Sequence, residues 1–294
     1  MKIKSLIYVL IASFVWASIG AVLRTINIGP LGFFFISSFF SLCTALLYLG
    51  GIKKLGELKE TEFTMDMFIF AVLQTILVSA SFYAFSDPEI STSAVILITN
   101  ATPLLIALIA PILIKEKSTK AEVIFAIIGF FGLIIFVYGQ STQGLEFNFS
   151  YGLILAFLAF VLNAFVSIMN RQVSQKNPDI LIPVILSTGN FIITLPLVLF
   201  LRIDIFSISL NDFLVTAVMG VFGGMLCFLF MAKAYKVLKV QLVSIILLSQ
   251  VIFAGILGFF FLGEIFNFLM ILGTIIVLGA NIGVVLSQKN RVRE

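Results

Sequence analysis

The residues of this sequence that could do chemistry are amide and hydroxyl side chains inside long apolar runs. Asn163, Ser167 and Asn170 are spaced i, i+4 and i+7, which places them on one face of a helix. Such groups donate and accept hydrogen bonds, and in apolar surroundings each must find a partner. They therefore either bond to neighbouring helices or line a cavity. The candidates for a cavity are Trp16, Gln74, Asn100, Asn163, Ser167 and Gln250.

Trp16 is the only tryptophan, and it lies in the middle of an apolar run. A tryptophan in a membrane segment packs against neighbours or anchors a helix end at the interface. Its mid-run position also allows a third role, which is stacking against a flat group in the cavity.

Residues for other kinds of chemistry are missing. The sequence has no histidine, the commonest general base and metal ligand, and Cys43 and Cys227 lie in separate apolar runs. No Asp or Glu lies mid-run, where one would mark a proton or ion relay. We therefore expect no catalytic residue, no metal site and no cofactor.

The elements that must position these side chains are membrane-spanning helices. Of the 294 residues, 61% are hydrophobic and 11% are charged, against about 25% charged in soluble domains. A span needs about 20 mainly apolar residues. The sequence predicts an all-α integral membrane protein with ten such runs: Leu6–Ile26, Leu31–Ile52, Met67–Phe85, Thr92–Ile114, Val123–Gly139, Gly152–Met169, Leu181–Leu201, Phe213–Ala232, Leu242–Leu262 and Phe266–Leu286.

The charges predict the orientation. With the N-terminus in the cytoplasm, every lysine and arginine except Arg24 and Arg202 falls on the inner side, as the positive-inside rule requires. We therefore expect a multi-pass protein of the cell membrane with both termini cytoplasmic. The net charge of +4 is explained by this asymmetry and does not indicate nucleic acid as a partner.

The chain also repeats itself. A shift of 148 residues places 93–116 on 241–264, matching Val95 with Val243 and Glu116 with Glu264. This predicts two five-helix repeats, residues 1–145 and 146–294. Because five is odd, the second repeat must be inverted relative to the first, a recurring plan among secondary transporters.

Ten spans in two halves, with each half's fourth helix ending in Glu116 or Glu264, resemble the EamA branch of the drug/metabolite transporter superfamily. The resemblance implies export or exchange of a small metabolite, such as an amino acid, by alternating access, and we expect export. The absence of charged residues mid-run, together with the amides, hydroxyls and Trp16, favours a neutral, zwitterionic or aromatic-bearing solute. The resemblance also implies a binding site between the first, third, fourth, sixth, eighth and ninth helices, which excludes the stripe Ser187, Asn190 and Thr194 of the seventh. A membrane-embedded enzyme and a channel-like pore are the alternatives.

Several local features carry further expectations. Glu116 and Glu264 either brace the turns that follow their helices or act in gating. Thr119 and Glu122 fit a capping box, and Asn267 is a candidate cap for the tenth helix. Gly279 and Gly283 form a GxxxG pair, which permits close internal packing or a homodimer.

Overall fold

Helices make up nearly all of the described structure. The computed structural model describes residues 2–23, 25–51, 63–87, 89, 92–116, 118–140, 150–205, 208–262 and 267–291. Within these ranges nine helices are long and apolar enough to cross a membrane, and Ile3–Ile19 is a shorter apolar helix.

The helices group into ten segments, five in each half, which confirms the expected all-helical membrane fold. The first half contains α1 (Lys2–Leu23), α2 (Pro30–Gly51), α4 (Met65–Ser86), α5 (Thr92–Thr99) followed by α6 (Thr102–Leu113), and α7 (Lys120–Gln140). The second half contains α8 (Tyr151–Lys176), α9 (Leu181–Phe200), the continuous series α10 (Leu210–Met219), η1 (Gly220–Leu226) and α11 (Cys227–Val237), then α12 (Val240–Leu247) with α13 (Ser249–Leu262), and α14 (Phe268–Arg291). The expected boundary between residues 145 and 146 lies outside the described residues.

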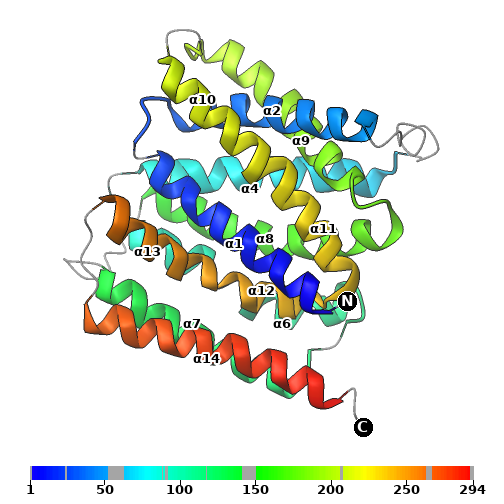
Figure 1. The fold of residues 1–294 in the computed structure, drawn as a ribbon, viewed down its shortest axis with the longest axis vertical. Helices are drawn as coiled ribbons and strands as arrows, with labels where there is room; N and C mark the ends of the chain where they lie inside the picture. The colour runs from blue at the N-terminus through cyan, green and yellow to red at the C-terminus, as the bar shows by residue number, and fades with distance from the viewer. Residues whose placement is uncertain are drawn as a thin grey trace.

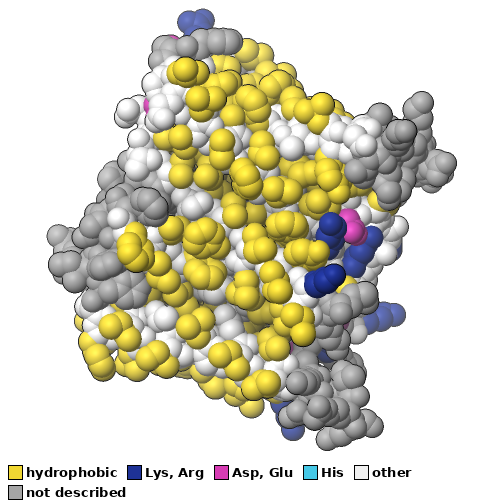
Figure 2. All heavy atoms as spheres, viewed as in Figure 1, with side chains coloured by type: hydrophobic (Ala, Val, Ile, Leu, Met, Phe, Trp, Pro, Cys, Tyr) yellow, Lys and Arg dark blue, Asp and Glu magenta, His cyan; other side chains and the backbone are white. Residues whose placement is uncertain are grey.

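Equivalent helices of the two halves pack against each other. Figure 1 shows α2 and α9 together toward one end of the long axis, and α7 beside α14 at the other. The segments α1, α4, α8 and α11 to α13 lie between these pairs. Figure 2 shows a broad apolar face over this arrangement, with most of its visible basic side chains on one side. We call this side, where α11 ends with Lys236 and α12 follows Lys239, the basic flank. Such a surface suits a lipid surrounding.

The fourth segment of each half is broken near its middle, at equivalent positions. The turn at Asn100 and Ala101 separates α5 from α6, and the turn at Leu248 separates α12 from α13. Asn100 and Leu248 are 148 residues apart, the same shift that relates the halves. Proline does not explain both breaks, because Pro103 lies in the first turn of α6, where it is tolerated, and α12 and α13 contain no proline.

Side chains fix the helix ends as the sequence predicts in two places. The Thr119 N–H donates to Glu122 Oε2 (2.6 Å) and the Glu122 N–H donates to Thr119 Oγ1 (3.1 Å), which confirms the capping box. Asn267 Oδ1 accepts from the Met270 N–H (3.0 Å), which confirms the cap of the tenth helix. Glu264 lies outside the described residues.

Asp87 connects the two halves at the end of α4. Its carboxylate accepts hydrogen bonds from the N–H groups of Glu89 (3.0 Å) and Gly152 (2.6 Å), the latter in the first turn of α8. Burial raises the pKa of this carboxyl, but these bonds and one from the Ser150 hydroxyl outweigh it and leave the pKa below its ordinary value.

One of the two glycines of the GxxxG pair in α14 packs closely against a neighbouring helix of the same chain. A Cβ on Gly283 would overlap the ring of Phe125 on α7, so this glycine permits close packing between α14 and α7. Gly279 has no atom within 4 Å of where its Cβ would lie.

Candidate functional site

A cavity of about 770 Å³ lies between the two halves. Residues from α1, α2, α4 and α5 to α6 of the first half face residues from α8, α9, η1, α11, α12 and α13 of the second across it. Its size is in the range of small-molecule sites. All six candidates from the sequence line this cavity: Trp16, Gln74, Asn100, Asn163, Ser167 and Gln250. The fold thus brings together side chains from five separate segments, and their part in binding stays a prediction.

The polar groups of the lining are uncharged. Among the described lining residues there is no Asp, Glu, Lys or Arg, while hydroxyl and amide side chains come from both halves. Such groups offer donors and acceptors without net charge. A solute held here would therefore meet hydrogen-bonding partners and no opposing ion.

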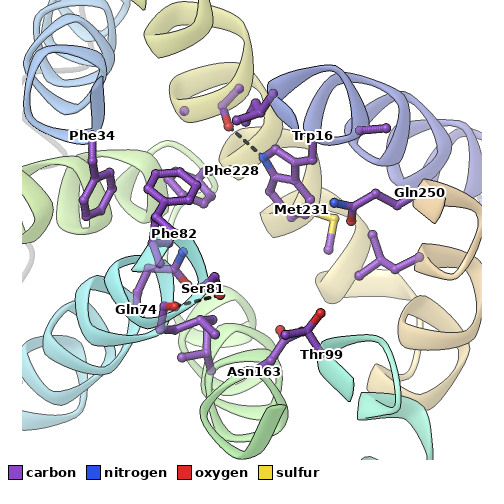
Figure 3. A pocket seen from close by; sticks show the side chains of 18 of the residues that line it. Trp16, Phe34, Gln74, Ser81, Phe82, Thr99, Asn163, Phe228, Met231 and Gln250 are labelled. Atoms are coloured by element: carbon purple, nitrogen blue, oxygen red, sulfur yellow. Dashed lines mark hydrogen bonds between the residues drawn. The ribbon is translucent and has the colours of Figure 1, made fainter. Parts of the chain in front are cut away.

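Two amides in the cavity are uncommitted within the described chain. Gln74 on α4 and Gln250 on α13 form no hydrogen bond with another described residue, and Figure 3 shows them on opposite sides of the cavity. Asn163 donates to Thr102 Oγ1 (3.2 Å), and Asn100 Nδ2 donates to the Ile96 carbonyl (3.0 Å). Gln74 and Gln250 are thus the amides most available to a solute.

Aromatic rings form another part of the lining. The rings of Phe34 and Phe82 meet edge to face with centroids 5.8 Å apart, and Trp16 meets Phe228 in the same manner at 6.2 Å. Met231 lies beside Trp16 (Figure 3). Sequence reasoning missed these phenylalanines because the chain has 33 of them and most lie in apolar runs without a distinguishing neighbour.

The second and seventh segments also line the cavity, contrary to the expectation that the Ser187 and Asn190 stripe is excluded. Ser187 shares a hydrogen bond with Ser41 of α2 (2.6 Å), and Asn190 Oδ1 accepts from Thr75 of α4 (2.8 Å). Both side chains are almost fully buried. Polar groups at the cavity wall are thus also used to join helices, and the expectation did not allow for both roles.

A contact between the two halves lies beyond the Tyr235 end of the cavity, and we interpret this end as closed. Glu116, just after α6, accepts hydrogen bonds from Arg171 on α8 (3.0 Å from Nη2, 3.3 Å from Nε) and from the N–H of Val240 at the start of α12 (3.0 Å). Arg171 also donates to the carbonyl of Tyr235, a cavity-lining residue. Lys115 has a positive φ of 56°, so the backbone turns sharply before Glu116. Glu116 therefore bridges the two halves, and whether it braces the following turn or acts in gating stays a prediction.

At its other end the cavity reaches the connection between α1 and α2. Ile28 and Pro30 of this connection line it, with Phe33 and Phe34 in the first turns of α2. The closed end lies where α1 begins, and the opposite end lies where α1 ends.

These features define a class of membrane protein: two five-helix halves enclosing an uncharged cavity, with broken helices at its wall and a closed end that joins the halves. This is the plan of a secondary transporter. The model of the EamA-like transporter family matches the chain twice, over residues 3–138 and 150–286. The chain belongs to the EamA-like transporter family, within the drug/metabolite transporter superfamily, and this is not a family of enzymes.

Two further similarities agree with this assignment. An uncharacterized transporter encoded in the sor 3′ region of Acidianus ambivalens is 28% identical over 202 residues, which is 67% of this chain and 75% of that protein. A protein of known crystal structure superposes with a TM-score of 0.83 over 99% of both chains at 14% identity. At that identity the likeness concerns the fold alone.

Proposed function

We propose that this transporter exports a small solute that is neutral or zwitterionic and carries an apolar or aromatic group, such as an amino acid. The observation that carries the proposal is the uncharged lining of the 770 Å³ cavity between the halves. A solute with net charge would lose its hydration there without gaining an ion pair. A neutral or zwitterionic solute can satisfy its polar groups with amides and hydroxyls.

The broken helices support a zwitterion in particular. The last turns of α5 and α12 and the first turns of α6 and α13 lie at the cavity wall, where Thr99, Asn100, Leu248 and Gln250 line it. Helix C-terminal ends carry partial negative charge and N-terminal ends partial positive charge. Such paired ends favour a solute that carries both signs.

The closed end supports a carrier over a channel-like pore. The contact of Glu116 with Arg171 and Val240 joins the halves at one end, while the cavity reaches the connection at Ile28 and Pro30 at the other. A carrier alternates between two such states. If the basic flank lies in the cytoplasm, as the positive-inside rule indicates, we assign this arrangement to the outward-facing state of the proposed carrier.

Untargeted mass spectrometry of the medium tests this proposal. Cells producing the wild type are compared with cells producing Asn163→Leu, which removes a cavity amide, and Asn281→Leu, which removes an amide of α14 outside the cavity lining. The amide of Asn281 forms no hydrogen bond with another described residue, so its loss leaves no described group without a partner. We expect a net-neutral solute to accumulate outside with the wild type and Asn281→Leu but not with Asn163→Leu. Accumulation of a charged solute, or equal accumulation with both variants, would contradict the proposal.

A further inference from the structure

The eighth segment of the chain changes its helical spacing beside Trp16. Between α10 and α11 the seven residues of η1 form a π-helix, and the Cys227 N–H reaches back to the carbonyl of Phe222, five residues earlier. The corresponding segment of the first half, α4, is an uninterrupted α-helix. Short π segments are rare in proteins and occur often at functional sites.

Glycines allow this segment to lie directly against its neighbours. A Cβ on Gly224 would come within 2.5 Å of Ser41 Oγ on α2, and one on Gly220 would overlap the backbone of Ser37. On the side of α1, a Cβ on Gly223 would lie 3.2 Å from Ile19 Cδ1. The backbone of η1 is therefore held between α2 and α1, with Gly223 against α1.

The backbone of this segment fixes the side chain of Trp16. The indole Nε1–H donates to the Gly223 carbonyl at 2.8 Å, as Figure 3 shows. An indole N–H inside a membrane protein needs such an acceptor, and one directed bond restricts how the ring can turn. The ring of Phe228 lies at 61° to the indole and supports it from the following helix.

Trp16 thus presents a rigid flat surface to the cavity, opposite polar groups. Figure 3 places Asn163 and Thr99 across the cavity from the indole, with Gln250 beside it. A solute whose polar part bonds to these groups would bring its apolar part against the indole and Met231.

We propose that Trp16, held by the Gly223 carbonyl of the π-helical segment, is the residue that selects the apolar part of the solute, favouring a flat aromatic ring over a saturated group of similar size. This inference rests on the proposed function, since it concerns the same cavity. Aromatic pairs gain attraction beyond the area they bury, so a preference of roughly 2- to 12-fold in half-saturating concentration is expected.

The binding test uses the protein's own fluorescence. Because Trp16 is the only tryptophan, its emission reports the cavity without any engineering. The probes are L-phenylalanine and L-β-cyclohexylalanine, which share the zwitterionic group and differ in whether the ring is flat. We expect both to change the emission of the purified protein in lipid nanodiscs, with phenylalanine acting at the lower concentration.

Transport by variants in proteoliposomes separates two contributions of Trp16, its flat aromatic face and the orientation that the Gly223 carbonyl fixes. Trp16→Leu removes the face and the hydrogen bond, so it is expected to abolish the ring preference. Trp16→Phe keeps an aromatic face but lacks the N–H donor, so its preference should fall close to that of Trp16→Leu. Phe14→Leu changes a half-exposed aromatic residue of the same helix that does not line the cavity, and it should keep the wild-type preference.

Each outcome decides the matter. Equal affinity of the wild type for both probes, or a ring preference that persists in Trp16→Leu, would overturn the inference about Trp16. The proposed function would still stand if transport of the probes saturates. A wild-type preference in Trp16→Phe would overturn the role of the Gly223 carbonyl. No response to either probe would overturn the inference for zwitterionic amino acids, and the export screen would decide the proposed function independently.

Discussion

Replacing Glu116 by glutamine is expected to weaken the closed end of the cavity and favour the state that opens toward the basic flank. The carboxylate belongs to the first half, while Arg171 and Val240 belong to the second. The side chains of Arg171 and Glu116 are 11% and 17% exposed, so solvent screens their attraction only in part. The contact can exist only while the halves meet at this end, and its loss therefore falls on the closed state alone.

The size of the effect follows from the hydrogen bonds involved. A hydrogen bond to a charged group contributes about 1.5–3 kcal/mol net. Glutamine keeps the shape of the side chain and one acceptor oxygen, so we expect the loss of one such contribution. This corresponds to a shift of roughly 10- to 150-fold in the ratio of the two states.

The assay measures access to the cavity from the basic flank. A single cysteine at Ser244, a lining residue of α12, is introduced after Cys43 and Cys227 are replaced by alanine. Membrane vesicles with the basic flank outward are treated with a membrane-impermeant thiol reagent. In the Glu116→Gln background the labelling rate should rise by about 10-fold or more.

Asp179→Asn provides the matched control. It makes the same carboxylate-to-amide change in an ion pair with Lys236 that lies wholly within the second half, where the side chains are 29% and 34% exposed. Such exposed pairs contribute at most about 1 kcal/mol, so labelling should change less than about 5-fold. A Glu116→Gln rate within twofold of wild type, or an equal rise in Asp179→Asn, would refute the reasoning.

Three further predictions concern stability and orientation. The folded-state pKa of Asp87 is lowered. The carboxylate therefore stabilises the fold above the ordinary carboxyl pKa, and this stabilisation is lost as the pH falls through the lower folded value. The melting temperature of the wild type should fall below about pH 4 for this reason, and that of Asp87→Asn should lack this contribution. Gly224→Ala should destabilise the protein by about 1–3 kcal/mol, because its Cβ would overlap Ser41. Gly279→Ala is the control and should be neutral or slightly stabilising, because nothing lies within 4 Å of its Cβ position. An unchanged melting temperature of Gly224→Ala would contradict the close packing of η1 against α2. A reporter that works only in the cytoplasm should be active when fused to either terminus, whereas a reporter that works only outside the cell membrane should be inactive. The opposite pattern would contradict the proposed orientation.

The sequence was sufficient for the helices and for much of the cavity. Long apolar runs have few alternatives in lipid, since backbone groups must be bonded within the segment. Amides such as Asn163 and Gln250 could be found because a polar side chain in such a run requires a partner or a cavity. The repeat of 148 residues predicted the division into two five-helix halves.

Other parts of the cavity have no feature in the sequence that would reveal them. Phe34, Phe82 and Phe228 look like any lipid-facing phenylalanine until neighbouring helices are placed around them. The break at Leu248 contains neither proline nor glycine, so only its counterpart at Asn100 could suggest it. The partner of Glu116 is Arg171, 55 residues away, and contacts at that separation are set by packing between helices.

Counterflow of the exported solute in proteoliposomes tests the central claim most directly. Vesicles preloaded with unlabelled solute should take up labelled solute faster than empty ones. Uptake should saturate and, because no titratable carboxylate or base lies among the described cavity-lining residues, it should persist when a pH gradient is collapsed. Flux that neither saturates nor responds to preloading would indicate a pore. A strict requirement for a pH gradient, with a solute that does not itself titrate, would contradict the uncharged binding site.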